Sequence, residues 1–183
     1  MKLTVPVLDD GVVALRPPEP GDVDPIYAIC QDPDIARFTL VPSPYARPDA
    51  VMWLERSTEN WRTGERASFV IVDAATGEVL GNLGVVRFDR AEDVAEVGYL
   101  VKREARGRGV ASRALTLVAR WVVDELSFGR MELLIDVHNH PSQRVAEKAG
   151  FLREGEVDPP ERCRERSDRM VLFALSAEVP AER

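Results

Sequence analysis

The sequence predicts an α/β (α+β) protein in which a mixed sheet of about seven strands is flanked by three to four helices. Apolar runs typical of strands and longer runs of helical period follow one another in the order ββααβββαβαβ. Two strands near the middle of this order are joined through a helix, and strands joined in this way are usually parallel. These observations together favour one mixed sheet with a parallel pair.

Length and composition are those of one globular domain. With 183 residues, 45% hydrophobic and 30% charged, the chain is long enough to bury a sizeable core. The formal net charge of −7 argues against a general nucleic-acid binder, and no stretch approaches the length of a membrane span. Two distant cysteines and an N-terminus without an apolar segment argue against a secreted protein. We expect one domain over residues 1–176, a frayed tail at 177–183, a cytoplasmic location, and no nucleic-acid or membrane partner.

The N-terminal part is expected to form a strand pair followed by helices. Turn residues around Gly11 separate two apolar strands between Leu3 and Arg16. Asp22 is a candidate N-cap for a helix from Val23 to about Gln31, and Asp49 is a candidate N-cap for a later one. The elements expected after the first helix are a short helix at Ile35–Phe38, a stiff loop with three prolines at residues 39–48, and a helix at Ala50–Thr63.

The remaining elements alternate between strands and helices. Gly81 and Gly84 lie inside one of the strands, where glycines indicate bulges or the close approach of another backbone. Gly150 is a natural C-terminal cap for the last helix. The expected elements are strands at Ala67–Val72, Val79–Asp89 and Val94–Val101, a helix from about Ala111 to Leu126, a strand at Met131–Val137, a helix at Pro141–Ala149, a further excursion from Phe151 to about Asp158, a charged loop at Pro159–Arg169, and a last strand at Met170–Leu175.

The stretch from Glu96 to Ala119 predicts an anion-binding site. An apolar strand runs into a turn that holds Gly107 and Gly109, and a helix begins within a residue or two. Backbone N–H groups and the positive end of a helix dipole would then point at one place, which suits a phosphate group. The glycines let the backbone approach the ligand without a Cβ in the way. The basic side chains of this turn are Arg103, Arg106 and Arg108.

Three interpretations of this turn compete. A strand-to-helix connection with a solvated basic loop is one of them. A dinucleotide-binding fingerprint would need a third glycine where the chain has Ser112. A Walker-type loop would need Gly-Lys-Ser/Thr, whereas Gly109 is followed by Val110 and Ala111. What remains is a pyrophosphate cradle of another kind.

Two blocks of the sequence resemble the GNAT acyl-CoA N-acyltransferases. Residues 106–111 (RGRGVA) match the Arg/Gln-x-x-Gly-x-Gly/Ala signature of that family. Residues 139–142 (NHPS) and 145–151 (VAEKAGF) resemble the N-x-x-S…V-A-x-K-x-G-F block of its RimJ/RimL-type ribosomal-protein N-acetyltransferase branch. The blocks lie in family order, and the resemblance covers most of the chain. It implies the GNAT fold, a mostly antiparallel sheet whose parallel central pair of strands splays apart.

The resemblance implies acetyl-CoA, or another acyl-CoA such as succinyl-CoA, as co-substrate, and no metal. In such proteins the pyrophosphate lies in the glycine turn, and pantetheine enters between the splayed strands and pairs with a strand edge. By the same resemblance Asn139 would hold the pantetheine amides, a role that is compatible with capping the helix that follows it. Carried onto this sequence, the cofactor-binding residues are Arg106, Gly107, Arg108, Gly109, Val110, Ala111, the backbone of Leu100 and Val101, Asn139 and Ser142.

Acyl transfer to an amine needs a group that removes the amine proton and a group that protonates the leaving thiolate. Glu96, on the central strand, is the candidate base, although a glutamate there can instead pair with an arginine. Asp136 and His138 are weaker candidates. Many family members carry a tyrosine where this chain has Ala146, so the resemblance assigns thiolate protonation to Ser142. An ordinary serine in the first turn of a helix is the alternative interpretation of Ser142.

The acceptor is the least readable part of the site. By resemblance it is a protein or peptide N-terminal amine, or a small-molecule amine, acylated by direct transfer in a ternary complex. Phe38 and Tyr45 are candidates to line the acceptor pocket, unless they only pack their loop onto the core. A ribosomal partner would favour acidic patches that face a basic tail. The alternative function is a non-catalytic acyl-CoA sensor of the same fold, and a homodimer through Trp53, Trp61 and the last strand is left open.

Overall fold

One sheet of eight strands organises the computed structural model, which describes residues 6–165 and 167–177. The strand order is β1-β2-β3-β4-β5-β6-β8-β7, and within the described residues only β5 and β6 pair in parallel. The strands are β1 (Leu8–Asp9), β2 (Val13–Arg16), β3 (Ala67–Asp73), β4 (Val79–Asp89), β5 (Val94–Val101), β6 (Arg130–Asp136), β7 (Leu152–Val157) and β8 (Met170–Ser176). The predicted mixed, mostly antiparallel sheet is confirmed, with one strand more than expected.

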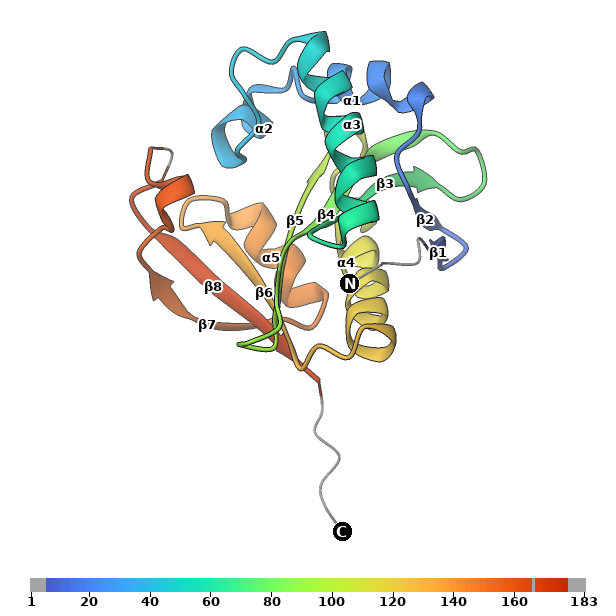
Figure 1. Ribbon diagram of the computed structural model, residues 1–183. Coiled ribbons are helices and arrows are strands. Elements are labelled where there is room, and N and C mark those ends of the chain that lie inside the picture. Colours follow the sequence, from blue (N-terminus) through green and yellow to red (C-terminus); the bar gives the residue numbers. More distant parts are fainter. Residues whose placement is uncertain (1–5, 166, 178–183) are drawn as a thin grey trace.

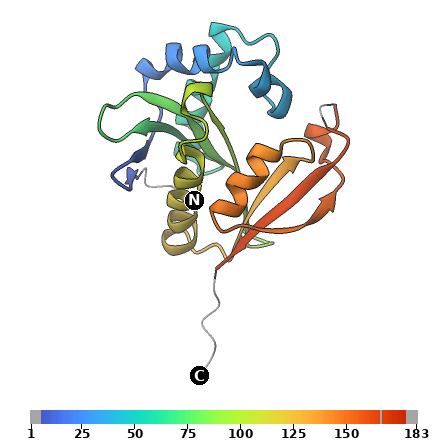
Figure 2. The ribbon, with the colours of Figure 1, turned by 180° about the vertical axis from the view of Figure 1, so that it is seen from behind.

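Helices flank the sheet on both faces (Figure 1). α3 packs on the face that carries Val70 and Val72, whereas α4 packs on the opposite face against Phe69 and Ile71. α5 covers the β6–β8 part of the sheet, as the view from behind shows (Figure 2). The α-helices are α1 (Val23–Ile29), α2 (Pro33–Phe38), α3 (Arg47–Thr63), α4 (Val110–Arg120) and α5 (His140–Lys148).

The two ends of the sheet differ from the prediction. The N-terminal strand pair, expected from Leu3 onwards, pairs Leu8 and Asp9 with Leu15 and Ala14, and Leu3 itself lies outside the described residues. β7 falls in the stretch expected only as an excursion. It is an edge strand whose sequence, LREGEV, is largely polar. Because neither of its faces is buried in the core, it lacks the apolar alternation by which strands are recognised.

The ends of α3 and α4 differ from the prediction for reasons that the structure shows. Asp49, expected as the N-cap of α3, lies inside its first turn, where one carboxylate oxygen accepts a hydrogen bond from the backbone N–H of Ala46 at 2.8 Å. The helix expected to reach Leu126 is α-helical to Arg120 and continues as one π turn, Trp121–Glu125. No helix among the described residues is long and apolar enough to cross a membrane.

A bulge in β4 determines which of its side chains share a face of the sheet with Glu96. Residues that pair across neighbouring strands share a face of the sheet, and one extra residue reverses the face of everything beyond it. The pairing runs Val85↔Val97 and then Arg87↔Glu96, so Val86 is the extra residue. The bulge therefore places Arg87 on the same face as Glu96. The glycines inside this strand were predicted to mark bulges or the close approach of another backbone, and Gly81 marks a close approach, because a Cβ there would collide with the carbonyl of Leu100.

The parallel pair is short and then opens. β5 and β6 are in register only from Val94↔Arg130 to Glu96↔Glu132. Beyond Glu96, β5 stays paired with β4, and β6 stays paired with β8. The two strands diverge in both ribbon views (Figures 1 and 2). The splayed central pair implied by the family resemblance is confirmed, and it leaves one edge of β5 open from Val97 onwards.

Candidate active site

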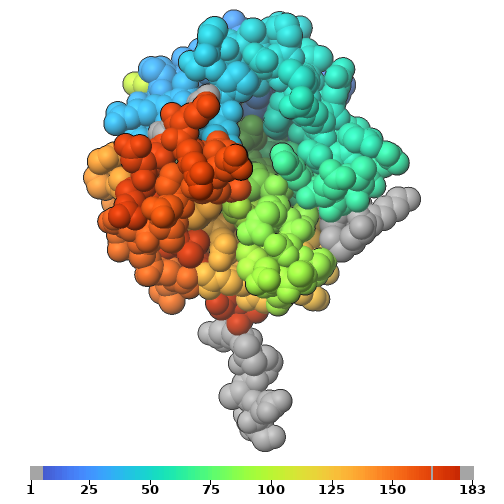
Figure 3. All heavy atoms as spheres, turned by 60° about the vertical axis from the view of Figure 1, so that its left-hand side comes forward, coloured from blue at the N-terminus to red at the C-terminus, as the bar shows by residue number. Residues whose placement is uncertain are grey.

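A cleft of about 1220 Å³ passes through the gap between β5 and β6. One end is lined by the turn before α4 and by α5, and the other by α3, β4, Arg162, Cys163 and Ser167. The space-filling view shows the surface hollowed where α3, the β4–β5 hairpin and the C-terminal segments meet (Figure 3). The end beside the turn before α4 and α5 is called the cofactor end, and the end beside α3 and β4 is called the acceptor end. The gap between the strands connects them.

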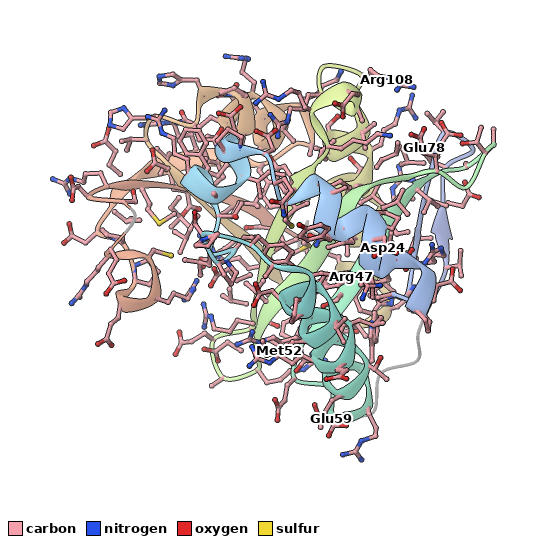
Figure 4. The ribbon with its side chains drawn as sticks, turned by 90° about the horizontal axis from the view of Figure 1, so that it is seen from above. Asp24, Arg47, Met52, Glu59, Glu78 and Arg108 are labelled. Atoms are coloured by element: carbon pink, nitrogen blue, oxygen red, sulfur yellow. The ribbon has the colours of Figure 1, made fainter. Side chains whose placement is uncertain are left out.

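The glycine turn lies at the cofactor end. Gly107 and Gly109 have φ of +74° and +80°, a left-handed conformation that disfavours residues with a Cβ. Gly109 directly precedes α4, whose first N–H groups have no acceptor within the helix. A Cβ at Gly109 would lie 3.9 Å from the ammonium nitrogen of Lys148. Arg108 extends from the tip of the same turn (Figure 4). Glycines, helix terminus and cations therefore meet as an anion site requires.

Lys148 was not among the predicted cofactor residues. It lies in the last turn of α5, far from the glycine turn in sequence, and α5 packs against α4. Its only sequence signal was its place in the VAEKAGF block. Sequence reasoning weighed the arginines of the turn because they are contiguous with the glycines.

Two of those arginines have acidic partners from another element. Arg106 contacts the carboxylates of Asp32 at 2.7 Å and Asp34 at 3.2 Å, and its Nε donates to the carbonyl of Val101 at 3.1 Å. Arg103 donates to Asp32 at 2.8 Å. The guanidinium hydrogen bond from Arg103 is the main cause that lowers the pKa of Asp32 to about 2. The ion pairs tie α2 to the cofactor turn, so Arg106 has a structural partner besides its predicted ligand.

The open edge of β5 carries the backbone groups predicted to bind pantetheine, but not both of them. The carbonyl of Leu100 lies against Gly81 of β4, so it faces away from the gap. Peptide groups alternate in direction along a strand, and Val101 accordingly accepts from the Arg106 side chain on the open side. The Leu100 side chain packs against α1 and α2 instead. For backbone binding, the geometry favours Val101 and, by alternation, Tyr99.

Tyr99 and Ser142 meet across the gap. Their hydroxyl oxygens are 2.7 Å apart, and either can be the donor. Asn139 caps α5, where its side-chain oxygen accepts from the backbone N–H of Ser142 at 3.2 Å. Burial raises the pKa of Tyr99 to about 12, so the phenol stays protonated at neutral pH. A tyrosine is thus present near the predicted acid, although it comes from β5 and not from the Ala146 position, which is fully buried.

Glu96 lies at the acceptor end, just where the strands begin to part. Its carboxylate is buried and forms ion pairs with Arg162 and, at 3.5 Å, with Arg87. Arg162 belongs to a single 3-10 turn, Glu161–Cys163, in the charged loop before β8. Glu96 therefore has the position expected of the base and also the arginine pairing that was the structural alternative. Sequence reasoning named the arginine pairing as an alternative but did not identify either partner.

The other predicted residues are placed more simply. Phe38 and Tyr45 both line the cleft, and Tyr45 also packs against the apolar cluster of α1 and α2. Asp136 lines the cleft and accepts from the backbone N–H of His138 at 2.7 Å. His138 itself is exposed at the end of β6. Within the described residues no group of three or more His, Cys, Asp or Glu side chains is arranged to hold a metal ion.

The comparisons with known proteins agree with this geometry. Residues 13–152 match the family described as the acetyltransferase (GNAT) domain. The L-amino acid N-acetyltransferase AaaT of Escherichia coli (strain K12) is 32% identical over 146 residues, covering 78% of this chain and 85% of that protein.

Two solved structures share the fold. The microcin C7 self-immunity acetyltransferase MccE, solved with acetyl-CoA and AMP, aligns with a TM-score of 0.83 at 18% identity over 92% of this chain and 94% of that chain. Mycobacterium smegmatis RimJ, solved with a CoA disulfide, aligns with a TM-score of 0.81 at 24% identity over 97% and 88%. The likeness to RimJ is one of fold, and it agrees with the RimJ/RimL resemblance of the sequence blocks.

The residues of the cofactor end fit acetyl-CoA. Left-handed glycines, a free helix N-terminus and Lys148 suit a pyrophosphate, and the unpaired edge of β5 suits the amides of pantetheine. MccE, which shares the fold, was solved with acetyl-CoA bound. The chain therefore belongs to the GNAT family and is an N-acetyltransferase.

Proposed function

We propose that this protein transfers the acetyl group of acetyl-CoA directly to an amine within a ternary complex, with Glu96 as the base and Ser142 as the acid. The observation that carries the proposal is the single cleft that joins the glycine turn to Glu96 through the opening between β5 and β6. A thioester held from the cofactor end and an amine entering from the acceptor end would meet at that opening. Holding two reactants in line is a large part of catalysis for such a reaction.

Glu96 has the position for proton removal. It is the last residue of β5 that pairs with β6, so its side chain lies beside the point where the gap begins. As the amine nitrogen forms its bond to the acetyl carbon, Glu96 would take a proton from that nitrogen, directly or through water. Arg87 and Arg162 hold the carboxylate in place on two sides. Their second effect is to bring positive charge to the acceptor.

Ser142 and Tyr99 have the position for proton supply on the other side of the gap. When the carbon–sulfur bond breaks, Ser142 would donate its hydroxyl proton to the leaving sulfur and recover a proton from solvent. The raised pKa of Tyr99 keeps its phenol protonated, so Tyr99 would donate a hydrogen bond to the serine oxygen during this step. The hydrogen bond from the Ser142 backbone N–H to Asn139 fixes the turn that carries the serine.

Two classes of acceptor are represented among the similar proteins. One relative is named for L-amino acids, and solved structures of the same fold include acetyltransferases of ribosomal proteins. Both a small amine and a protein N-terminus are therefore tested. The proposed reaction requires of the acceptor only that its amine can reach Glu96.

The test combines binding and turnover. In a thermal melt with acetyl-CoA at about a hundred times its Kd, we expect stabilisation by about 2.7 kcal/mol, which corresponds to a rise of about 5–10 °C. Release of CoA thiol is then measured with a panel of amines and peptides, with Ser142→Ala and Tyr99→Phe compared with the parent. We expect both variants to bind acetyl-CoA and to lose about tenfold or more in kcat.

Three outcomes separate the alternatives. Stabilisation with turnover that depends on Ser142 and Tyr99 supports the proposal. Stabilisation without acetylation of any amine favours a sensor of acyl-CoA. Turnover that is unchanged in both variants would show that the assignment of the acid is wrong.

A further inference from the structure

The acceptor end of the cleft is rich in arginine, although the chain as a whole carries a net charge of −7. The arginines come from four separate segments of the chain, so their convergence is a property of the fold. Arg56 lies on α3, Arg66 just before β3, Arg87 on β4, and Arg162 in the turn before β8. The local field therefore has the opposite sign from the average of the surface.

Acidic side chains cancel only part of this charge. Glu96 is held between Arg87 and Arg162, and Arg87 also pairs with Asp89 at 2.7 Å. Asp49 also lines the cleft, but it accepts a hydrogen bond from the backbone of Ala46. Among the described residues neither Arg56 nor Arg66 has an acidic partner, and both side chains are exposed. Two guanidinium groups thus line the cleft without a carboxylate to satisfy them.

The floor between these groups is open. Gly84 and Gly98 pair with each other on the face of the sheet that carries Glu96. A Cβ built at Gly98 would meet only the Cγ1 of Val86 within 4 Å, at 3.8 Å, and Gly98 lines the cleft. Arg66 precedes β3, two strands away from β5, which is about 10 Å at the usual spacing of strands. The side chains of Glu96 and Arg66 both line the cleft, so an acceptor of small-molecule size can meet the two together.

From this arrangement we propose that the acceptor is a small amine that also carries an anionic group, either carboxylate or phosphate. The amine lies beside Glu96, and the anion pairs with Arg56 and Arg66, whose planar guanidinium groups suit either oxyanion. A basic protein tail, which a ribosomal partner would present, meets repulsion at this end. The inference rests on the proposed function, because it names the substrate of the same site.

The first measurement compares acceptors that differ only in charge. The pairs are glycine with glycinamide, phenylalanine with phenylalaninamide, and O-phosphoethanolamine with ethanolamine; a lysine-rich peptide is added as the basic acceptor. We expect kcat/KM to be about tenfold or more higher for the anionic member of at least one pair, since hydrogen bonds to charged groups are strong. The carboxylate raises the pKa of the neighbouring amine, so intrinsic reactivity favours the amides and cannot produce this result. Preference for amino acids or for the phosphate separates the two sources of the anion.

The second measurement tests the arginines. In the Arg56→Gln/Arg66→Gln double variant we expect KM for the anionic acceptor to rise about tenfold or more, with the uncharged acceptor unaffected. Arg62→Gln is the matched control, because Arg62 lies on the same helix but pairs with Glu59 outside the cleft. Trp53 lines the cleft, so its fluorescence also reports binding of N-acetylphenylalanine and of its amide to the CoA-bound protein without turnover.

The outcomes distinguish this inference from the proposed function. Faster turnover of the uncharged members or of the basic peptide would overturn the inference and leave the acetyltransferase proposal standing. An anion preference that survives in the double variant would overturn the assignment to Arg56 and Arg66. Bound acetyl-CoA with no acetylation of any amine would overturn both.

Discussion

The two ends of the cleft bind charge in different ways. At the cofactor end, positive potential comes from backbone N–H groups, a helix terminus and Lys148, and two of the nearby arginines are neutralised by Asp32 and Asp34. At the acceptor end the relation is reversed. The carboxylate of Glu96 lies between two arginines, and among the described residues Arg56 and Arg66 have no acidic partner.

This difference follows from what each end has to recognise. Backbone dipoles are fixed by the fold and need no ordering when the ligand binds, which suits a ligand that is always the same. Long arginine side chains adapt to the position of an anion but lose rotamer freedom when they are ordered. We infer that cofactor recognition is preorganised and that acceptor recognition is adjustable. Substitutions at the two ends should therefore separate the effects on the two substrates.

The largest expected effect is that of Glu96→Gln. The amide keeps the shape of the side chain but cannot take a proton, so we expect kcat to fall by about a hundredfold to ten-thousandfold. Because the cofactor end is untouched, the KM for acetyl-CoA should stay within about threefold of the parent value. Steady-state kinetics with a fixed good acceptor measure both constants.

Glu132→Gln is the matched control for this substitution. Glu132 pairs in register with Glu96 on the neighbouring strand and has its own arginine partner, Arg130, at 2.8 Å. A similar loss of kcat in both variants would point to damage of the sheet, and equal activity of Glu96→Gln and the parent would remove Glu96 as the base.

A smaller effect, confined to the other end, is expected for Gly109→Ala. The left-handed backbone at Gly109 costs a non-glycine residue about 1 kcal/mol, and the new methyl group would point towards Lys148, where the pyrophosphate is expected. We expect the KM for acetyl-CoA to rise about tenfold, with the KM for the amine unchanged. Isothermal titration with CoA checks the binding directly.

Gly77→Ala separates strain from binding. Gly77 has a similar left-handed φ, +74° compared with +80° at Gly109, in the turn between β3 and β4, and a Cβ there meets nothing within 4 Å. Both variants should lose similar stability in urea unfolding. If CoA affinity falls equally in both, the glycine turn before α4 is not the anion site.

The cofactor end could be predicted from sequence because it is nearly contiguous. The glycines, the arginines and the first residues of α4 lie within about ten positions, and their geometry follows from local rules for turns and helix termini. Lys148 was missed because only tertiary packing of α5 on α4 brings it to Gly109. The ion pairs of Arg106 with α2 were missed for the same reason.

The acceptor end could not be predicted, because its parts are distant in sequence and its register depends on one bulge. Arg87 shares a face with Glu96 only because Val86 is an extra residue in β4. No residue type in the stretch Val85–Arg87 predicts a bulge. Tyr99 was read as part of an apolar strand, and nothing in its neighbourhood indicates contact with Ser142. The strands themselves were predictable where one face is buried, as for β4 and β5, and β7 was not, because it is an exposed edge.

The smallest expected effect concerns the carboxylates that neutralise the cofactor turn. Asp32→Asn keeps a side-chain oxygen that can cap α2, as Asp32 does for Asp34 at 3.0 Å, but it removes the charge that pairs with Arg103 and Arg106. Because those arginines are partly exposed and screened, we expect a loss of only about 1 kcal/mol at pH 7, or about 2–4 °C in Tm.

The native pKa of Asp32 is lowered from 3.8 to about 2, so the ionised carboxylate stabilises the fold above pH 3.8. That contribution should disappear as the pH falls from 3.8 towards about 2, and urea unfolding across this range measures it as a shrinking difference between parent and variant. Asp24→Asn, which removes only the exposed pair with Arg47 between α1 and α3 (Figure 4), should leave stability indistinguishable from that of the parent. A difference for Asp32→Asn that stays constant with pH would mean that the lost stability has another origin than the charge on Asp32, and the proposed neutralisation of the cofactor turn would then be wrong.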